Sequence, residues 1–217
     1  MGRLLGVYVI PLVLGILLIG GCVPVPRQVS VPLHPTAPLQ AVLYADPLTT
    51  DRGAWQCGPL ASCLYEKNGL HILAPTDHLY FSLLSDHVFG EAVIDVQAAL
   101  DNGDPAFVGV AIAFRSSGLD GYGFLVYANG MYELVKWDAK GTATILIPLT
   151  ASTSILTGLN HRNDLKVIAR GAEITLFSNG QPLNLITDST FASGQIALGA
   201  ARFAADAVFS HLVVTSP

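Results

Sequence analysis

Short apolar runs separated by turn residues fill the chain from about residue 41 to its end, and the pattern is clearest over 107–137. Residues 107–115 form an apolar run, as expected of a strand buried on both faces. Two further runs, over 121–128 and 131–137, are separated by Asn129-Gly130, a pair typical of a two-residue hairpin turn with positive φ at both positions. This block therefore predicts three consecutive antiparallel strands.

The same signals predict strands on both sides of this block, while no long stretch beyond the N-terminal segment has the 3.6-residue apolar period of a helix. The strands are expected at 41–45, 64–67, 70–73, 78–84, 88–98, 141–149, 163–170, 172–178, 181–187, 193–201 and 207–215. Asn68-Gly69 and Asn179-Gly180 predict two more tight hairpins. Residues 150–158, rich in Ser and Thr, predict a loop with at most one helical turn. The chain is thus expected to be an all-β antiparallel β-sandwich of two sheets packed face to face.

Strand alternation also predicts which side chains of the block share a face. Tyr122 is expected to point to one side of its strand and Tyr127 to the other. On the next strand, Tyr132 is expected on the face opposite to that of Glu133 and Trp137.

The N-terminus has the three parts of a secretory signal: a positive head ending at Arg3, an uncharged apolar stretch over 4–21 and small residues before Cys22. A cysteine at this place resembles the lipobox of bacterial lipoproteins. In that family the thiol receives a diacylglycerol, and cleavage makes the cysteine the first residue. We therefore expect residues 1–21 to be a lipoprotein signal peptide and Cys22 to be the lipidation site. The alternative is an uncleaved membrane anchor, since this apolar stretch nearly spans a bilayer.

Either alternative places the folded part outside the cytoplasm, and lipidation would attach it to the cell membrane or to the outer membrane. Membrane lipid is then a partner through Cys22, and two or more acyl chains would make the attachment stable. Five prolines follow within 22–40, a density that favours extended, semi-rigid chain. We interpret 22–40 as a tether and 41–217 as one folded domain, with packing of part of the tether as an edge strand as the alternative.

Composition narrows the class of protein further. The net charge is −5, and the eleven Lys and Arg residues are scattered without a basic stripe, which argues against a nucleic-acid partner. Cys57 and Cys63 are the only cysteines besides Cys22. In an oxidising compartment such a close pair predicts a structural disulfide.

The order and spacing of several short motifs resemble the concanavalin A-like lectin/glucanase domains, including the laminin-G-like and 3-keto-disaccharide hydrolase-like groups. The resemblance covers about residues 43–215 and implies a jelly roll of two curved antiparallel sheets. One departure concerns the closing strand, where Phe209-Ser210-His211-Leu212 lacks the acid found in many relatives, so no role of that acid is carried over. The matching segments are 44–55 (YADPLTTDRGAW), 109–115, 122–127, 163–167, 176–180, 194–198 and 209–213.

Candidate catalytic and metal-binding groups are sparse. Hydrolases of this fold often carry E-x-D-x-E on one strand, but the chain has no such string, and Glu133 is the best single acid without an identifiable partner. Asp101–Asp104 lacks the full spacing of a calcium loop and predicts a plain turn. The histidines form no metal motif, and no acyl-transfer or nucleotide motif occurs. We therefore expect no metal and no cofactor, and an enzyme is the less favoured interpretation.

Sugar binding is the function that the residue types in this chain support best. Sugar sites combine an aromatic platform with side chains that make directed hydrogen bonds to hydroxyls. The candidate ligand-binding residues are Arg115, Asp120, Tyr122, Asn129, Tyr132 and Trp137. The leading hypothesis is a membrane-anchored extracytoplasmic lipoprotein with a non-catalytic, lectin-like domain for a glycan or polysaccharide. The alternatives are a structural or protein-interaction module of the cell envelope and a hydrolase acting on a sugar derivative.

Overall fold

The computed structural model describes residues 40–58, 61–118, 120–202 and 204–217. The expected signal peptide, Cys22 and all of the expected tether except Gln40 lie outside these residues. In the part that is described, no helix has the length and apolar character needed to cross a membrane.

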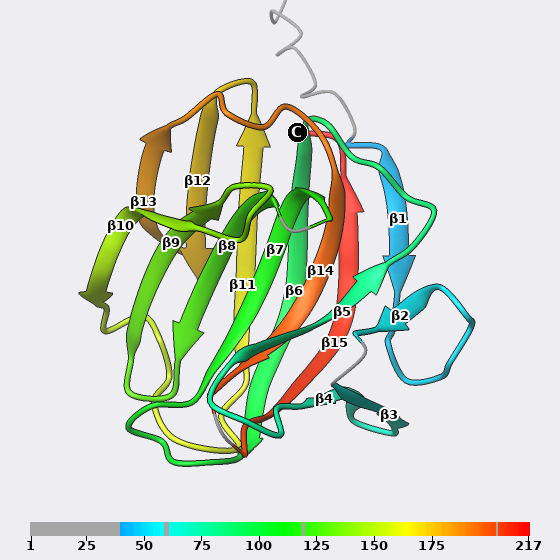
Figure 1. Ribbon diagram of the computed structural model, residues 1–217, viewed down its shortest axis with the longest axis vertical. Helices are drawn as coiled ribbons and strands as arrows, with labels where there is room; N and C mark the ends of the chain where they lie inside the picture. Colours follow the sequence, from blue (N-terminus) through cyan, green and yellow to red (C-terminus); the bar gives the residue numbers. More distant parts are fainter. Residues whose placement is uncertain (1–39, 59–60, 119, 203) are drawn as a thin grey trace, which may run out of the picture. The chain divides into compact units, whose positions relative to one another are not determined.

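The described residues form fifteen β-strands in two antiparallel sheets that lie face to face (Figure 1). The eight-stranded sheet has the order β13 (Gln181–Thr187), β12 (Glu173–Ser178), β11 (Asn163–Arg170), β6 (Ala92–Asn102), β15 (Asp206–Thr215), β4 (Gly69–Leu73) and β3 (Ser62–Glu66), with β1 (Val42–Asp46) paired to β15. The seven-stranded sheet has the order β10 (Ala143–Ala151), β9 (Met131–Trp137), β8 (Asp120–Tyr127), β7 (Gly109–Ser117), β14 (Gln195–Ala201), β5 (Leu79–Leu84) and β2 (Trp55–Cys57). The predicted all-β antiparallel sandwich is confirmed.

The inner faces of the two sheets supply one apolar core. Its largest fully buried side chains include Phe114, Tyr122, Phe124 and Phe209. Period-two alternation explains this composition, because every second residue of each central strand points between the sheets. The expected faces are confirmed: Tyr122 belongs to the core between the sheets and Tyr127 to a smaller cluster on the other side of β8.

The predicted block of three antiparallel strands is also confirmed as β7, β8 and β9, but its hairpin turn differs from the prediction. The Gly130 N–H donates to the Tyr127 carbonyl at 3.0 Å, and of Asn129 and Gly130 only Gly130 has positive φ, at 85°. The expected Asn-Gly turn with two positive φ values is therefore wrong here. The chain uses a longer turn that ends with glycine in the left-handed region.

The other two Asn-Gly pairs behave differently from each other. Asn179 and Gly180 have φ values of 51° and 77°, and Ser178 pairs with Gln181, so the predicted two-residue turn is confirmed. Gly69 instead pairs with Glu66 as the first residue of β4, which makes the Asn68-Gly69 turn prediction wrong by one residue. A Cβ at Gly69 would lie 2.2 Å from the Phe209 carbonyl oxygen, so glycine is required there for close backbone approach.

The predicted disulfide between Cys57 and Cys63 is present. Cys57 ends β2, the last strand of the seven-stranded sheet, and Cys63 lies in β3, the last strand of the eight-stranded sheet. The bond therefore joins the two sheets at one edge of the sandwich.

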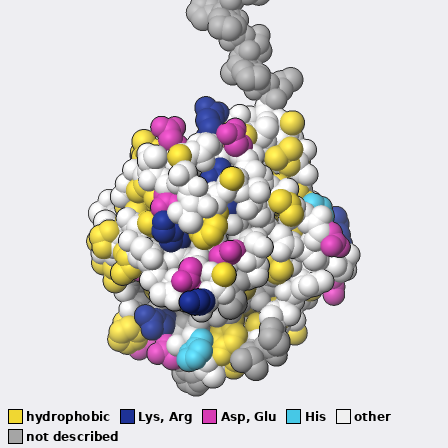
Figure 2. Space-filling model, turned by 45° about the horizontal axis from the view of Figure 1, so that its top comes forward, with side chains coloured by type: hydrophobic (Ala, Val, Ile, Leu, Met, Phe, Trp, Pro, Cys, Tyr) yellow, Lys and Arg dark blue, Asp and Glu magenta, His cyan; other side chains and the backbone are white. Residues whose placement is uncertain are grey.

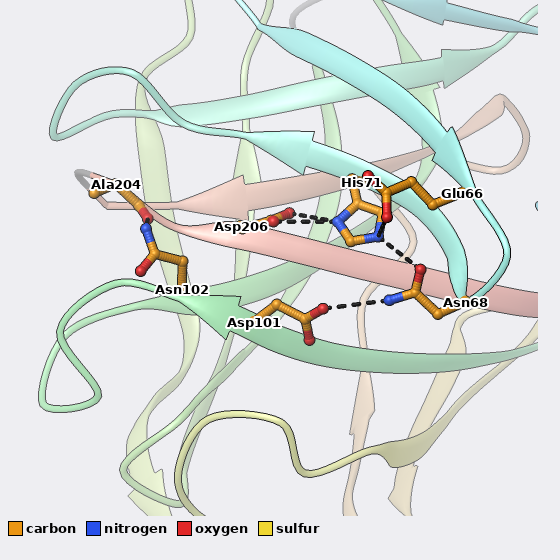
Figure 3. A network of polar contacts seen from close by, with 7 residues as sticks. All are labelled: Glu66, Asn68, His71, Asp101, Asn102, Ala204 and Asp206. Carbon is orange, nitrogen blue, oxygen red and sulfur yellow. Dashed lines mark hydrogen bonds and ion pairs between the residues drawn. The ribbon is translucent and has the colours of Figure 1, made fainter.

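A network of polar side chains holds the β3–β4 hairpin against the central strands of its sheet (Figure 3). His71 Nδ1 lies 3.0 Å from Asp206 Oδ1, and His71 Nε2 lies 2.9 Å from Asn68 Oδ1. The Asn68 amide donates to Asp101 Oδ2 at 3.3 Å. Asp101 therefore lies at the end of β6 and contributes to the fold, which corrects the expectation that it belongs to a plain turn.

Charged side chains are spread over the surface of the domain. On the face that Figure 2 shows, basic and acidic groups are interspersed, and no large patch of one sign forms. Among the described residues, no surface patch of one sign therefore marks a binding site on this face.

Candidate functional site

The outer face of the seven-stranded sheet carries a hollow of about 640 Å³, here called the main hollow. Small residues on two neighbouring strands make part of its floor: Ala113 on β7 and Ala197 on β14. Because strand alternation points these residues outward in the middle of the sheet, the surface is low there, and larger side chains on β5 and β9 form its walls.

Two aromatic rings lie on glycines of this surface. A Cβ added to Gly123 would lie 2.2 Å from Trp137 Cη2, and one added to Gly199 would lie 2.6 Å from Phe81 Cδ1. Any residue other than glycine at position 123 or 199 would therefore place its Cβ in the space that the ring occupies. The centroids of Phe81 and Trp137 are 6.2 Å apart with an interplanar angle of 80°. Both side chains are half-buried, so they offer aromatic surface in a fixed orientation.

Polar groups line the main hollow beside these rings. Gln56 of β2, His78 before β5, Ser116 of β7 and Asp120 of β8 all contribute. Asp120 Oδ1 accepts the Ser117 N–H at 3.1 Å, which fixes the carboxylate at the end of the β7–β8 hairpin. The site therefore combines rigid apolar planes with hydrogen-bonding groups of both kinds.

A second hollow of about 320 Å³, here called the side hollow, adjoins the main one. Trp137, His78 and Leu79 line both hollows. The side hollow adds Glu133 of β9, whose Oε1 accepts a hydrogen bond from the Tyr127 hydroxyl at 2.6 Å.

An ion pair between Arg202 and Asp77 lines the side hollow. Arg202 Nη1 is 3.5 Å from Asp77 Oδ1, and both side chains are more than half exposed. The pair stabilises little in water, but it neutralises one carboxylate of the hollow.

Three of the six predicted site residues are buried parts of the fold. Arg115 is 3 % exposed and donates to the carbonyls of Gly90, Gly171 and Phe191. The structure places Tyr122 and Tyr132 in the core between the sheets, where Tyr122 has no exposed surface. Their side chains therefore hold loops in place; Tyr122 borders the main hollow without exposed surface, and Tyr132 does not line it.

Tyr122 and Tyr132 each fasten a different segment. The Tyr122 hydroxyl donates to Asp188 Oδ1 at 2.6 Å, and the Tyr132 hydroxyl donates to the Leu183 carbonyl at 3.1 Å. Asn129 is exposed in the β8–β9 turn and donates to the Ala106 carbonyl at 2.8 Å.

Of the predicted residues that line the main hollow, Asp120 and Trp137 are partly exposed, whereas Tyr122 is fully buried. Sequence reasoning missed Phe81, Gln56 and His78, which lie on or next to strands far from 107–137 along the chain. The sequence does contain a signal for the main hollow: Gly and Ala occupy alternate positions of 109–113 and 197–201, which leaves one face of these strands without large side chains. Among the residues that the structure describes, no group of His, Cys, Asp or Glu is placed to hold a metal ion.

No family model matches the sequence, and no curated protein matches it. Solved structures do match. A carbohydrate-binding module from Bacillus subtilis is 21 % identical, with a TM-score of 0.64 over 75 % of this chain and 96 % of that one. A Bacillus subtilis protein of unknown function with a galectin-like fold is 13 % identical, with a TM-score of 0.65 over 81 % and 96 %.

A β-glucanase from Bacillus licheniformis is 11 % identical, with a TM-score of 0.57 over 80 % of this chain and 97 % of that one. The fold is the concanavalin A-like jelly roll. The resemblance inferred from the order of the sequence motifs is thus confirmed for the fold. At these identities the similarity shows the fold alone. The function of this chain depends on the residues that line its own hollows.

Proposed function

We propose that the protein binds carbohydrate, without catalysis, in the main hollow of its concanavalin A-like domain. The observation that carries this proposal is the pair of rings, Phe81 and Trp137, lying on a Gly and Ala floor beside polar groups. The C–H faces of a sugar ring pack on such planes, and its hydroxyls hydrogen-bond with groups such as Asp120 and Gln56. A carbohydrate-binding module and a glucanase share the fold, which supports this function class.

The arrangement of acids favours binding over hydrolysis. Hydrolysis of a glycosidic bond requires two carboxyl groups flanking the bond. In the side hollow, Glu133 is engaged by Tyr127, while Asp77 is largely exposed and paired with Arg202. Asp120 has an oxygen committed to a backbone N–H. We therefore assign these acids to recognition.

The proposal includes membrane attachment. Residues 1–21 would be removed as a signal peptide, Cys22 would carry the lipid, and 22–40 would be the tether of an extracytoplasmic domain. A Cys22→Ala variant of the full chain should then leave the membrane fraction or keep its signal peptide, and it should lose incorporation of a labelled fatty acid. Equal incorporation of the fatty acid by the variant and the unmodified protein would rule out Cys22 as the lipidation site.

A glycan array probed with the full chain tests the binding function. Trp137→Ala should weaken any hit at least tenfold, which corresponds to about 1.4 kcal/mol. The fold should survive, since Trp137 lies outside the core between the sheets. Phe107→Ala is the matched control, because Phe107 is 63 % exposed and does not line either hollow. A blank array with folded protein, or an equal loss in both variants, would contradict the proposal.

A further inference from the structure

The side hollow lies directly beside the proposed sugar site and contains a carboxylate, that of Glu133, which pairs with no cation among the described residues of the hollow. Resting on the proposed function, we infer that the bound glycan extends past Trp137 into the side hollow, where Glu133 selects sugars that carry a protonated amino group. The ligand class is then an amino sugar with a free amine. A ligand that crosses this boundary stays in contact with Trp137, because that residue lines both hollows.

Glu133 is held in position to receive a cation. The Tyr127 hydroxyl donates to its Oε1 at 2.6 Å, and Tyr127 is only 8 % exposed, so the donor is fixed by packing. Burial, and then the bond to Glu133, raise the pKa of Tyr127 above its ordinary value, which keeps the phenol a donor. A carboxylate accepts about four hydrogen bonds, and the tyrosine uses one of them.

The charges around the side hollow point to the same ligand. Asp77 and Arg202 neutralise each other at 3.5 Å, which leaves the charge of Glu133 without a cationic partner among the residues that line the hollow. Leu125 and Val135 lie beside it and are buried, so the surroundings are less polar than open water. Attraction between opposite charges is stronger in such surroundings.

A neutral sugar would bind to the Glu133 carboxylate less tightly than a cationic one. A hydroxyl would still donate a hydrogen bond to Glu133, but it carries no net charge, so the Coulomb attraction between an ammonium and the carboxylate would be missing. An N-acetylated amine has lost its charge and most of its donors. The site should therefore separate two glycans that differ only in acetylation.

The experiment compares a glucosamine oligomer with its N-acetylated counterpart of equal length, titrated calorimetrically into the full chain. We expect the free amine to bind at least tenfold more tightly at low salt and neutral pH. Glu133→Gln keeps the size of the side chain and an acceptor for Tyr127 but removes the charge, so the ratio of the two affinities should fall to about one.

Glu173→Gln is the matched control, because Glu173 is exposed on β12 of the other sheet and its loss changes the net charge equally. Its affinity ratio should equal that of the unmodified protein. Equal binding of the two oligomers, or a preference that survives Glu133→Gln, would overturn the inference while leaving Trp137-dependent binding intact. Failure of every glycan to bind would overturn the proposed function as well.

Discussion

At the residue scale, one partly buried carboxylate connects the two sheets at an end of the sandwich. Asp188, in the loop after β13, accepts bonds from the Tyr122 hydroxyl at 2.6 Å and from Lys136 Nζ at 2.7 Å, and it also accepts the Thr190 N–H. Burial alone would raise the pKa of Asp188. The hydrogen bonds from Lys136, Thr190 and Tyr122 outweigh that effect and hold the pKa well below its ordinary value.

The depressed pKa of Asp188 predicts a pH-dependent contribution to stability. A carboxyl group with a lower pKa in the folded state stabilises the fold above its unfolded pKa of about 3.9, and this stabilisation is lost as the pH falls toward the folded value. We expect Asp188→Asn to lower the free energy of unfolding by roughly 1–3 kcal/mol at pH 7. Urea denaturation should show the difference from the unmodified protein shrinking below about pH 4.

Asp164→Asn is the control for this prediction, because Asp164 is exposed on β11 and its substitution removes the same charge. It should change stability by less than about 0.5 kcal/mol. A difference between Asp188→Asn and the unmodified protein that stays constant from pH 7 to pH 3 would show that shape, and not charge, explains the contribution of Asp188.

The residue scale also shows why half of the predicted site residues belong to the interior. Residue type suggests sugar contact for an arginine or a tyrosine, but the face on which each residue lies decides its role. Alternation correctly separated Tyr122 from Tyr127, yet it could not tell which face looks outward. Arg115 lies at a bulge with φ of 49°, and such an interruption of the pleat re-aims a side chain in a way that alternation does not predict.

At the element scale, the sequence predicted most strands because turn residues separate them clearly. β9, β11 and β13 have the predicted bounds, β2 was not predicted, and the other strands shift by a few residues. The main hollow was beyond this reasoning, since it requires β5, β14, β7 and β8 to be neighbours. The β5–β14 and β14–β7 pairings join segments far apart in the chain, and local pattern carries no information on which distant strands meet.

The disulfide is the element-scale feature with the clearest energetic consequence. It closes a short loop between β2 and β3, so the chain-entropy argument assigns it about 2 kcal/mol. We expect the Cys57→Ser, Cys63→Ser double variant to lose about that much free energy of unfolding in urea denaturation. Amide hydrogen exchange should speed up most in β2 and β3, since these strands end their sheets.

Reduction of the unmodified protein is the control for the double variant. It should give the same loss of stability, because both treatments remove only the cross-link. Unchanged exchange in β2 and β3 after reduction would mean that strand pairing alone holds this edge of the sandwich.

At the scale of the whole molecule, the last strand lies in the middle of the larger sheet. β15 pairs with β6 on one side and with β4 and β1 on the other (Figure 1). Without β15, neither β1 nor the β3–β4 hairpin has a partner that links it to the rest of its sheet. The sheet is therefore continuous only when the C-terminal strand is in place.

A chain that ends at Ala205 should accordingly fail to fold. We expect it to lack a cooperative thermal transition and to bind a hydrophobic dye, because Phe209 and Leu212 would be missing from the core. A chain that ends at Ser216 is the control and should melt like the unmodified protein. A cooperative transition in the shorter chain would mean that β6 and β4 reach a stable arrangement without β15.

The central position of β15 also sets an order of events in time. A ribosome makes β15 last, so the eight-stranded sheet has no continuous form while the rest of the chain is emerging. Long-range strand pairing of this kind folds slowly. The larger sheet of this domain therefore cannot close before β15 has been made.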